Sequence, residues 1–151
     1  MPQLLVIGEW QRSEMSPIQS WLGALGSQAV VRRTNFLPCD DHLEPPDLVV
    51  VCQSWPDEFP ASDVSAALGR WPLAMWVCCY GAWCASDGRT RTDWPISVRV
   101  PVAEAEQRLN HLWRVLTEQR GEPLPFTASR DEAFEFDHCF DDSLTTQTAR
   151  L

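Results

Sequence analysis

Thiols are the residues of this sequence with the most versatile chemistry. Cys52 ends the apolar run "PDLVVVCQSWP" (residues 46–56), and Cys78 and Cys79 lie in the next long apolar run, "PLAMWVCCYG" (residues 72–81). If the two runs are neighbouring parallel strands, their thiols meet at one edge of a sheet, where they could form a redox switch or a soft-metal site. No Cys-x-x-Cys spacing is present, and no basic residue flanks Cys52. The sequence therefore favours buried, apolar cysteines over a thiol cluster, and we expect no metal.

Lysine is absent from the chain, and all twelve basic residues are arginine. A Walker lysine and a Schiff-base lysine are therefore excluded, and no Gly-rich phosphate loop is present. The three histidines, His42, His111 and His138, have no second ligand or base at a zinc-motif or triad spacing. We therefore expect no catalytic residues and no cofactor. The net charge of -9 argues against a nucleic-acid partner, because phosphate binding requires clustered positive charge.

The first residues, "MPQLLVIGEW", contain a short apolar run without a positive flank, which fits neither a signal peptide nor a membrane span. We therefore expect a cytoplasmic protein without membrane contact, whose six cysteines are reduced thiols. A protein partner is the expected kind of ligand.

Apolar runs alternate with helical periods as far as residue 120, as a parallel sheet with covering helices requires. Helices with one apolar stripe are predicted over residues 16–26, 61–71 and 102–120, with Ser16 and Ser62 as the N-caps of the first two. The segments between the second and third strands and between the fourth and fifth strands are rich in proline or polar residues, so their helices should be weak or absent. Predicted strands cover residues 4–8, 29–34, 47–52, 72–81 and 96–101.

The composition changes at Gly121, which divides the chain into a folded domain (1–120) and a tail (121–151). The tail has seven acidic residues against two arginines, and no strand or helix period. Its phenylalanines Phe134, Phe136 and Phe140 are interleaved with the acids. Such a pattern is typical of a linear element that docks on a basic, apolar groove, whereas the alternative is a solvated tail whose phenylalanines fold back onto the domain.

Residues 3–120 resemble the receiver domain of the two-component response regulators. The resemblance rests on "LLVIGE", on "PDLVVVCQSWP", on "PLAMWVC" and on "VRVPVAEAEQRLNHLWRVL". It implies an α/β fold with a five-stranded parallel sheet, a flavodoxin-like three-layer sandwich, here with weakened second and fourth helices and an irregular acidic C-terminal tail.

The resemblance also implies where the family's phosphorylation chemistry would lie. The two acidic magnesium ligands fall on Gly8 and Glu9, the phosphate-accepting aspartate on Cys52, the hydroxyl residue on Val77 and the lysine on Val100. Phosphoryl transfer needs hard oxygen ligands for a cation and a positive group for the developing charge. Only Glu9 has a suitable side chain, so the resemblance implies a pseudo-receiver with a degenerate site.

Tryptophans surround the same predicted edge of the sheet. Trp10, Trp55, Trp83 and Trp94 lie at or just beyond the carboxyl ends of strands. Four large aromatic side chains there either plug a vacant pocket or form an interaction surface, since tryptophan is enriched at interaction hot spots.

Two functions follow from these patterns. We expect a non-catalytic signalling or regulatory domain that binds protein through the tryptophans, the last helix or the acidic tail. The alternative is a small ligand-binding or thiol-redox protein of flavodoxin-like fold that uses the pocket at the strand ends. A homodimer through the outer side of the last helix, where Glu104, Glu106, Arg108 and Arg114 are expected, is a further hypothesis.

Overall fold

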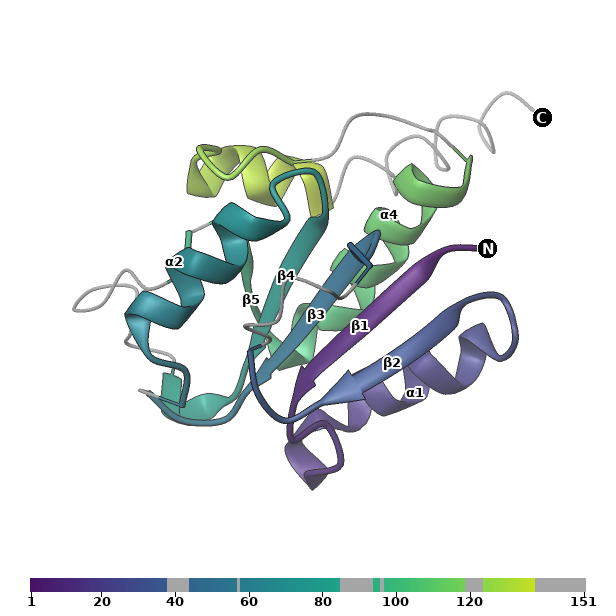
Figure 1. Ribbon diagram of the computed structural model, residues 1–151, viewed down its shortest axis with the longest axis horizontal. Coiled ribbons are helices and arrows are strands. Elements are labelled where there is room, and N and C mark those ends of the chain that lie inside the picture. Colours follow the sequence, from purple (N-terminus) through teal and green to yellow (C-terminus); the bar gives the residue numbers. More distant parts are fainter. Residues whose placement is uncertain (38–43, 57, 85–93, 96, 119–123, 138–151) are drawn as a thin grey trace.

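A central sheet of five parallel strands organises the protein, in the order β2-β1-β3-β4-β5 (Figure 1). The computed structural model describes residues 1–37, 44–56, 58–84, 94–95, 97–118 and 124–137. The α/β class and the five-stranded parallel sheet predicted from the sequence are confirmed. The strands are β1 (Gln3–Gly8), β2 (Val30–Thr34), β3 (Leu48–Gln53), β4 (Met75–Tyr80) and β5 (Arg99–Pro101).

The inner strands are buried on both faces. Every residue of β3 is buried, and so is every residue of β1 after Gln3. A parallel strand covered by helices on both sides has no polar face, which is why these strands appear in the sequence as continuous apolar runs. By contrast, β2 is only partly buried and carries Arg32 and Arg33, as an edge strand does.

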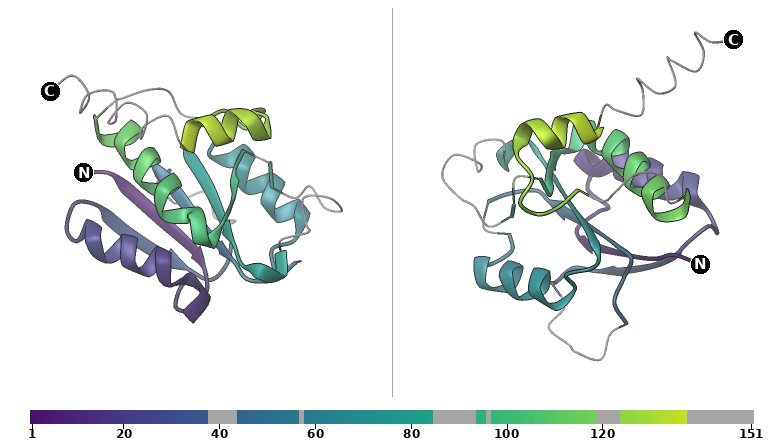
Figure 2. Two further views of the ribbon diagram at one scale, coloured as in Figure 1. Left: turned by 180° about the vertical axis from the view of Figure 1, so that it is seen from behind. Right: turned by 90° about the horizontal axis from the view of Figure 1, so that it is seen from above.

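Helices cover the two faces of the sheet unequally (Figures 1 and 2). α1 (Ser16–Leu25) and α4 (Ala105–Glu118) pack side by side on one face, where the indole of Trp21 donates a hydrogen bond of 3.0 Å to the side chain of Asn110. α2 (Ala61–Arg70) packs on the opposite face, above a second core cluster. The molecule therefore has three layers, with the sheet in the middle.

The helix boundaries differ from the prediction at their N-termini. Ser16 is the first residue of α1 rather than its cap, because the 3-10 turn η1 (Ser13–Met15) leads directly into the helix. Ser62 lies inside α2, whose N-cap is Pro60, and neither helix has a side-chain cap hydrogen bond. Gly26 ends α1 with a φ of 56°, as expected for glycine at a helix C-terminus.

Short 3-10 turns follow the last two strands. η2 (Ala82–Cys84) follows β4, and η3 (Val102–Glu104) joins β5 to α4. Most of the segments expected to have weak helices, residues 38–43 and 85–93, lie outside the described residues.

The expectation of an irregular tail is wrong for residues 130–137, which form a helix. Ala128 and Ala133 are buried against the rest of the molecule. In Figure 2 this helix lies at the end of the sheet where β4 begins. The prediction missed the helix because a short helix stabilised by tertiary contacts has little apolar periodicity of its own. Residues 138–151, including Phe140, lie outside the described part of the chain.

Candidate functional site

Four buried residues form a row across the carboxyl edge of the sheet. Gly8 of β1 is in register with Cys52 of β3, Cys52 with Cys79 of β4, and Cys79 with Val100 of β5. Of the positions predicted at the strand ends, Gly8, Cys52 and Val100 lie in this row. Val77 does not. Val77 pairs with Val50 and lies before the end of β4, because that strand continues to Tyr80. The row therefore contains no carboxylate, hydroxyl or cation.

There is no space for a side chain at Gly8, the residue of this row that belongs to β1. Its φ is 98°, and a Cβ atom at this position would lie 2.4 Å from the carbonyl oxygen of Cys52. Only glycine adopts this backbone conformation without strain, and no side chain fits so close to a neighbouring carbonyl. The position that the receiver resemblance assigns to a magnesium-binding acid therefore has no room for one.

The thiols at this edge do not form one cluster. Cys52 and Cys79 pack into the core on the α1 and α4 side, whereas Cys78 packs on the α2 side and donates a hydrogen bond of 3.4 Å to Gln53 Oε1. Burial, and then the nearby Glu58 carboxylate, raise the pKa of Cys52 to about 12. Burial also raises the pKa of Cys78 and of Cys79 well above the usual range. Near neutral pH these cysteines are protonated, which disfavours nucleophilic and metal-binding roles.

Within the described ranges, no three histidine, cysteine or acidic side chains converge on a common point.

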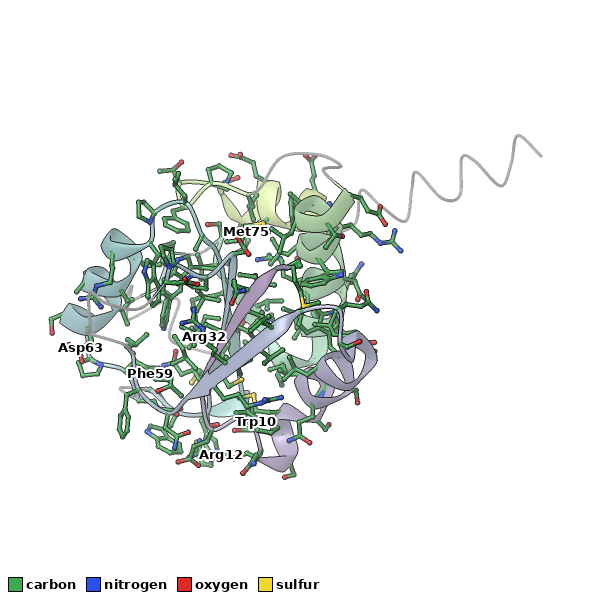
Figure 3. All side chains as sticks on the ribbon, turned by 45° about the vertical axis from the view of Figure 1, so that its right-hand side comes forward. Trp10, Arg12, Arg32, Phe59, Asp63 and Met75 are labelled. Carbon is green, nitrogen blue, oxygen red and sulfur yellow. The ribbon has the colours of Figure 1, made fainter. Side chains whose placement is uncertain are left out.

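Arg12 occupies the space above the strand ends, and sequence reasoning did not single it out. Its guanidinium lies 2.6 Å from Glu9 Oε2 and 3.9 Å from Glu58 Oε1, and it covers the ring of Trp55 at 4.0 Å from the centroid. Figure 3 shows Trp10 and Arg12 at the end of the sheet toward which β1 and β2 run. A guanidinium is permanently charged and presents only donors. The Arg12 guanidinium therefore offsets part of the negative charge of Glu9 and Glu58.

Glu58 is the more enclosed of the two carboxylates that contact Arg12. Its Oε1 accepts a hydrogen bond of 2.7 Å from the backbone N–H of Ser54. Burial raises the pKa of Glu58, although the backbone hydrogen bond and Arg12 act in the opposite direction. The hydroxyl of Ser54 and the Nη1 of Arg12 are both buried without a hydrogen-bond partner among the described residues.

The predicted tryptophans separate into buried and exposed groups. Trp94 is buried between Phe59 and Trp76 on the α2 side, so it belongs to the core rather than to the rim. Trp10 is partly buried under the guanidinium of Arg33. Trp55 and Trp83 are respectively 44% and 79% exposed, on the segments that follow β3 and β4.

A third exposed aromatic residue at this edge was missed. Phe36 follows β2 and is 77% exposed. Its position in a proline-rich segment, two residues after a strand, was the available signal. We refer to Phe36, Trp55 and Trp83 as the aromatic rim. A cavity of about 330 Å³ lies at the same edge, lined by Glu9, Trp10, Gln11, Arg12 and Asn35.

The two described phenylalanines of the tail differ in their surroundings. Phe136 stacks on His111, with ring centroids 3.9 Å apart, whereas Phe134 is 63% exposed. Arg108, expected on the outer side of the last helix, is instead buried and paired with Asp137. Of the four charged residues expected on the outer side, Arg108 is therefore not part of that surface, whereas Glu104 and Glu106 are exposed.

The described residues include no helix with the length and apolar character needed to cross a membrane. Comparison with protein-family models, with curated proteins and with solved structures finds no match to this chain.

Proposed function

We propose that this protein is a non-catalytic protein-interaction domain, a pseudo-receiver that has lost its phosphorylation site. The observation that carries the proposal is the buried row Gly8, Cys52, Cys79 and Val100, which offers no oxygen ligand for magnesium and no carboxylate to accept a phosphoryl group. The strand order β2-β1-β3-β4-β5 supports the resemblance, since flavodoxin-like sheets of the receiver type have this order.

Arg12 strengthens the argument against metal-dependent chemistry. A working site would hold a divalent cation between oxygen ligands above the strand ends. Here the guanidinium of Arg12 contacts Glu9 and lies near Glu58, the carboxylates that such a cation would need. A second cation at this position would face electrostatic repulsion in a partly buried site.

The aromatic rim is the proposed interaction surface. Exposed tryptophans on adjacent segments are uncommon on monomers and typical of binding surfaces. The hydrogen bond of 2.9 Å from the Gly81 N–H to the Gln53 carbonyl ties the segments after β3 and β4 together. The guanidinium of Arg12 covers the Trp55 ring, so less side-chain entropy is lost when a partner binds.

Magnesium and beryllofluoride, a phosphoryl mimic, test the loss of the phosphorylation site. We expect the amide NMR spectrum of the full chain to be the same with and without them, because no residue of the row coordinates either group. A receiver with an intact site, measured in parallel, is the control. Specific shifts at Glu9, Cys52 and Gly81 would contradict the proposal.

Site-specific photo-crosslinking tests the interaction surface. A photoreactive residue at Trp83 should capture a partner from an extract of the native organism, and Trp55→Ser should reduce the yield. The matched control is the same residue at Ser65, which is exposed on α2 and lies away from the rim. Equal capture from both positions would contradict a specific role for the rim.

The cavity beside Trp10 supports a second candidate, a small-ligand site at the same edge. It contains Arg12 and Glu9 as polar groups and an indole as an apolar surface. Native mass spectrometry of the purified protein would detect a bound ligand as extra mass, and Trp10→Ala should abolish it. The thiol-redox version of this alternative is disfavoured, because the pKa of Cys52 is raised to about 12.

A further inference from the structure

The C-terminal segment 124–137, which we call the strap, is anchored to α4 by polar and ring contacts. Both carboxylate oxygens of Asp137 accept hydrogen bonds from Arg108, and the Asp137 carbonyl accepts one of 3.1 Å from the side chain of Gln107. The ring of Phe136 stacks almost parallel on His111, at an interplanar angle of 8°. An aromatic residue followed by a carboxylate therefore forms the anchor.

Arg108 is buried, so its positive charge requires a carboxylate partner beside α4. Its side chain is 3% exposed, and its Nη1 also donates a hydrogen bond of 2.6 Å to the Ser97 carbonyl. A buried guanidinium without a counter-ion is strongly destabilising, whereas a buried pair contributes little net stability compared with apolar packing. The Arg108–Asp137 pair therefore contributes mainly to specificity, because Arg108 requires a carboxylate next to α4. It contributes little to the strength of binding.

The apolar part of the strap packs incompletely. Its buried apolar residues are the small Ala128 and Ala133, and its larger Phe126 and Phe136 are only partly buried. A cavity of about 370 Å³ separates residues 124–126 of the strap from α4 and the start of β4, and its lining includes Arg108, Leu112 and Trp76. Met75, at the same end of the sheet, also lines it (Figure 3). A short helix has little stability in isolation, and an underfilled contact adds little more.

We propose that the strap is a displaceable internal occupant of a docking groove on α4. Its external ligand is a helical segment of a partner protein that ends in an aromatic residue followed by a carboxylate. The aromatic ring replaces Phe136 on His111, and the carboxylate replaces Asp137 on Arg108. Larger apolar side chains of the partner fill the cavity that the strap leaves open.

This groove is separate from the aromatic rim. The rim follows the carboxyl ends of the strands, whereas the cavity of the groove is lined by residues 72–76, at the amino end of β4. The proposal therefore goes beyond the proposed function and can fail or succeed independently of it.

A synthetic peptide with the sequence of residues 124–137 is the probe for the groove. In the wild-type chain the tethered strap competes with the peptide at an effective concentration on the order of millimolar, so the peptide binds weakly. Asp137→Asn in the chain weakens the internal competitor without altering the groove. We expect the apparent affinity of a fluorescent peptide, measured by anisotropy, to rise by about tenfold or more in this variant.

Three controls define the chemistry of binding. The peptide with Asp137→Asn should not bind, because it brings no carboxylate to Arg108. The Arg108→Gln chain should not bind the wild-type peptide. A peptide with Leu124→Trp should bind more tightly than the wild-type peptide, since position 124 lines the cavity. Near-ultraviolet circular dichroism checks that each chain variant is folded.

Equal affinity of the peptide for the wild-type and Asp137→Asn chains would overturn the proposal. Binding that persists in the Arg108→Gln chain would also overturn it. If the Asp137→Asn chain does not fold, Phe136→Ala serves as the second variant, because it weakens the ring stack and keeps the ion pair. The same rise in affinity is expected there, and its absence would count equally against the groove.

Discussion

Glu58 shows how burial can outweigh a nearby opposite charge at a single residue. Its carboxylate is 3.9 Å from Arg12 and accepts the Ser54 N–H, yet burial raises its pKa. A raised pKa in the folded state means that this carboxyl group favours folding while it is protonated. That contribution is present below the pKa of the unfolded chain and is lost as the pH rises through the raised value.

Glu58→Gln should therefore stabilise the protein at neutral pH. The amide can still accept the Ser54 N–H, but it carries no charge that must be buried. We expect the free energy of unfolding, measured with urea, to exceed that of the wild type at pH 7. The difference should disappear as the pH falls well below the ordinary glutamate pKa of about 4.3, because the wild-type carboxyl group is then protonated in both states.

Glu9→Gln is the matched control, because Glu9 also contacts Arg12 but its side chain is 54% exposed. Its effect should remain below about 1 kcal/mol, as for other surface ion pairs. A Glu58→Gln variant that is less stable than the wild type at pH 7 would show instead that attraction to Arg12 outweighs burial.

Helix 130–137 illustrates how local signals and tertiary contacts combine at the scale of an element. Ser129 and Glu132 form a reciprocal capping box, in which each side chain accepts a hydrogen bond from the other's backbone N–H. The S-x-x-E spacing was visible in the sequence, yet the residues after it have no apolar stripe. The helix forms because Ala133, Phe136 and Asp137 find partners on the folded domain.

Ser129→Ala should destabilise this helix locally by about 1 kcal/mol, the usual loss for a removed N-cap. Hydrogen exchange of the amides after Ser129 should accelerate accordingly, while exchange in the sheet should not change. Ser62→Ala is the matched control, because Ser62 makes no capping hydrogen bond in α2. Equal acceleration in both variants would mean that the capping box has no specific role.

At the scale of the whole molecule, the core is divided by the sheet into two clusters. One lies under α1 and α4, and the other lies under α2 with Trp71, Trp76 and Trp94. The strap adds to the first cluster through Phe136, which packs against it. Phe126 of the strap packs against the second cluster, so the protein is a three-layer fold with a C-terminal addition that contacts both sides of the core.

A chain that ends at Arg120 should be less stable than one that ends at Asp137, by roughly 1–3 kcal/mol. The shorter chain loses the carboxylate on Arg108 and the packing of Ala128 and Ala133. Water can hydrate the uncovered guanidinium, which limits the loss. Urea unfolding of the two chains measures the difference directly. Equal stability would mean that the strap contributes nothing to the fold.

The sequence by itself determined the α/β class, the five strands and the positions of α1, α2 and α4. Those features depend on local patterns, since a buried parallel strand is a continuous apolar run and a surface helix has an apolar stripe. The resemblance to receiver domains also placed Gly8, Cys52 and Val100 at one edge of the sheet. That these residues carry no carboxylate, hydroxyl or basic group could be read from residue types alone.

Only the tertiary structure decided which residues meet. Cys79, rather than Val77, completes the row because the register between strands is not marked in an apolar run. Arg12 contacts Glu58 from a separate loop, and Trp94 is enclosed by two aromatic residues of other segments. Asp137 pairs with Arg108 across 29 residues of sequence, a distance over which no local pattern carries information. Contacts between separate segments depend on the folded arrangement, so composition and spacing do not reveal them.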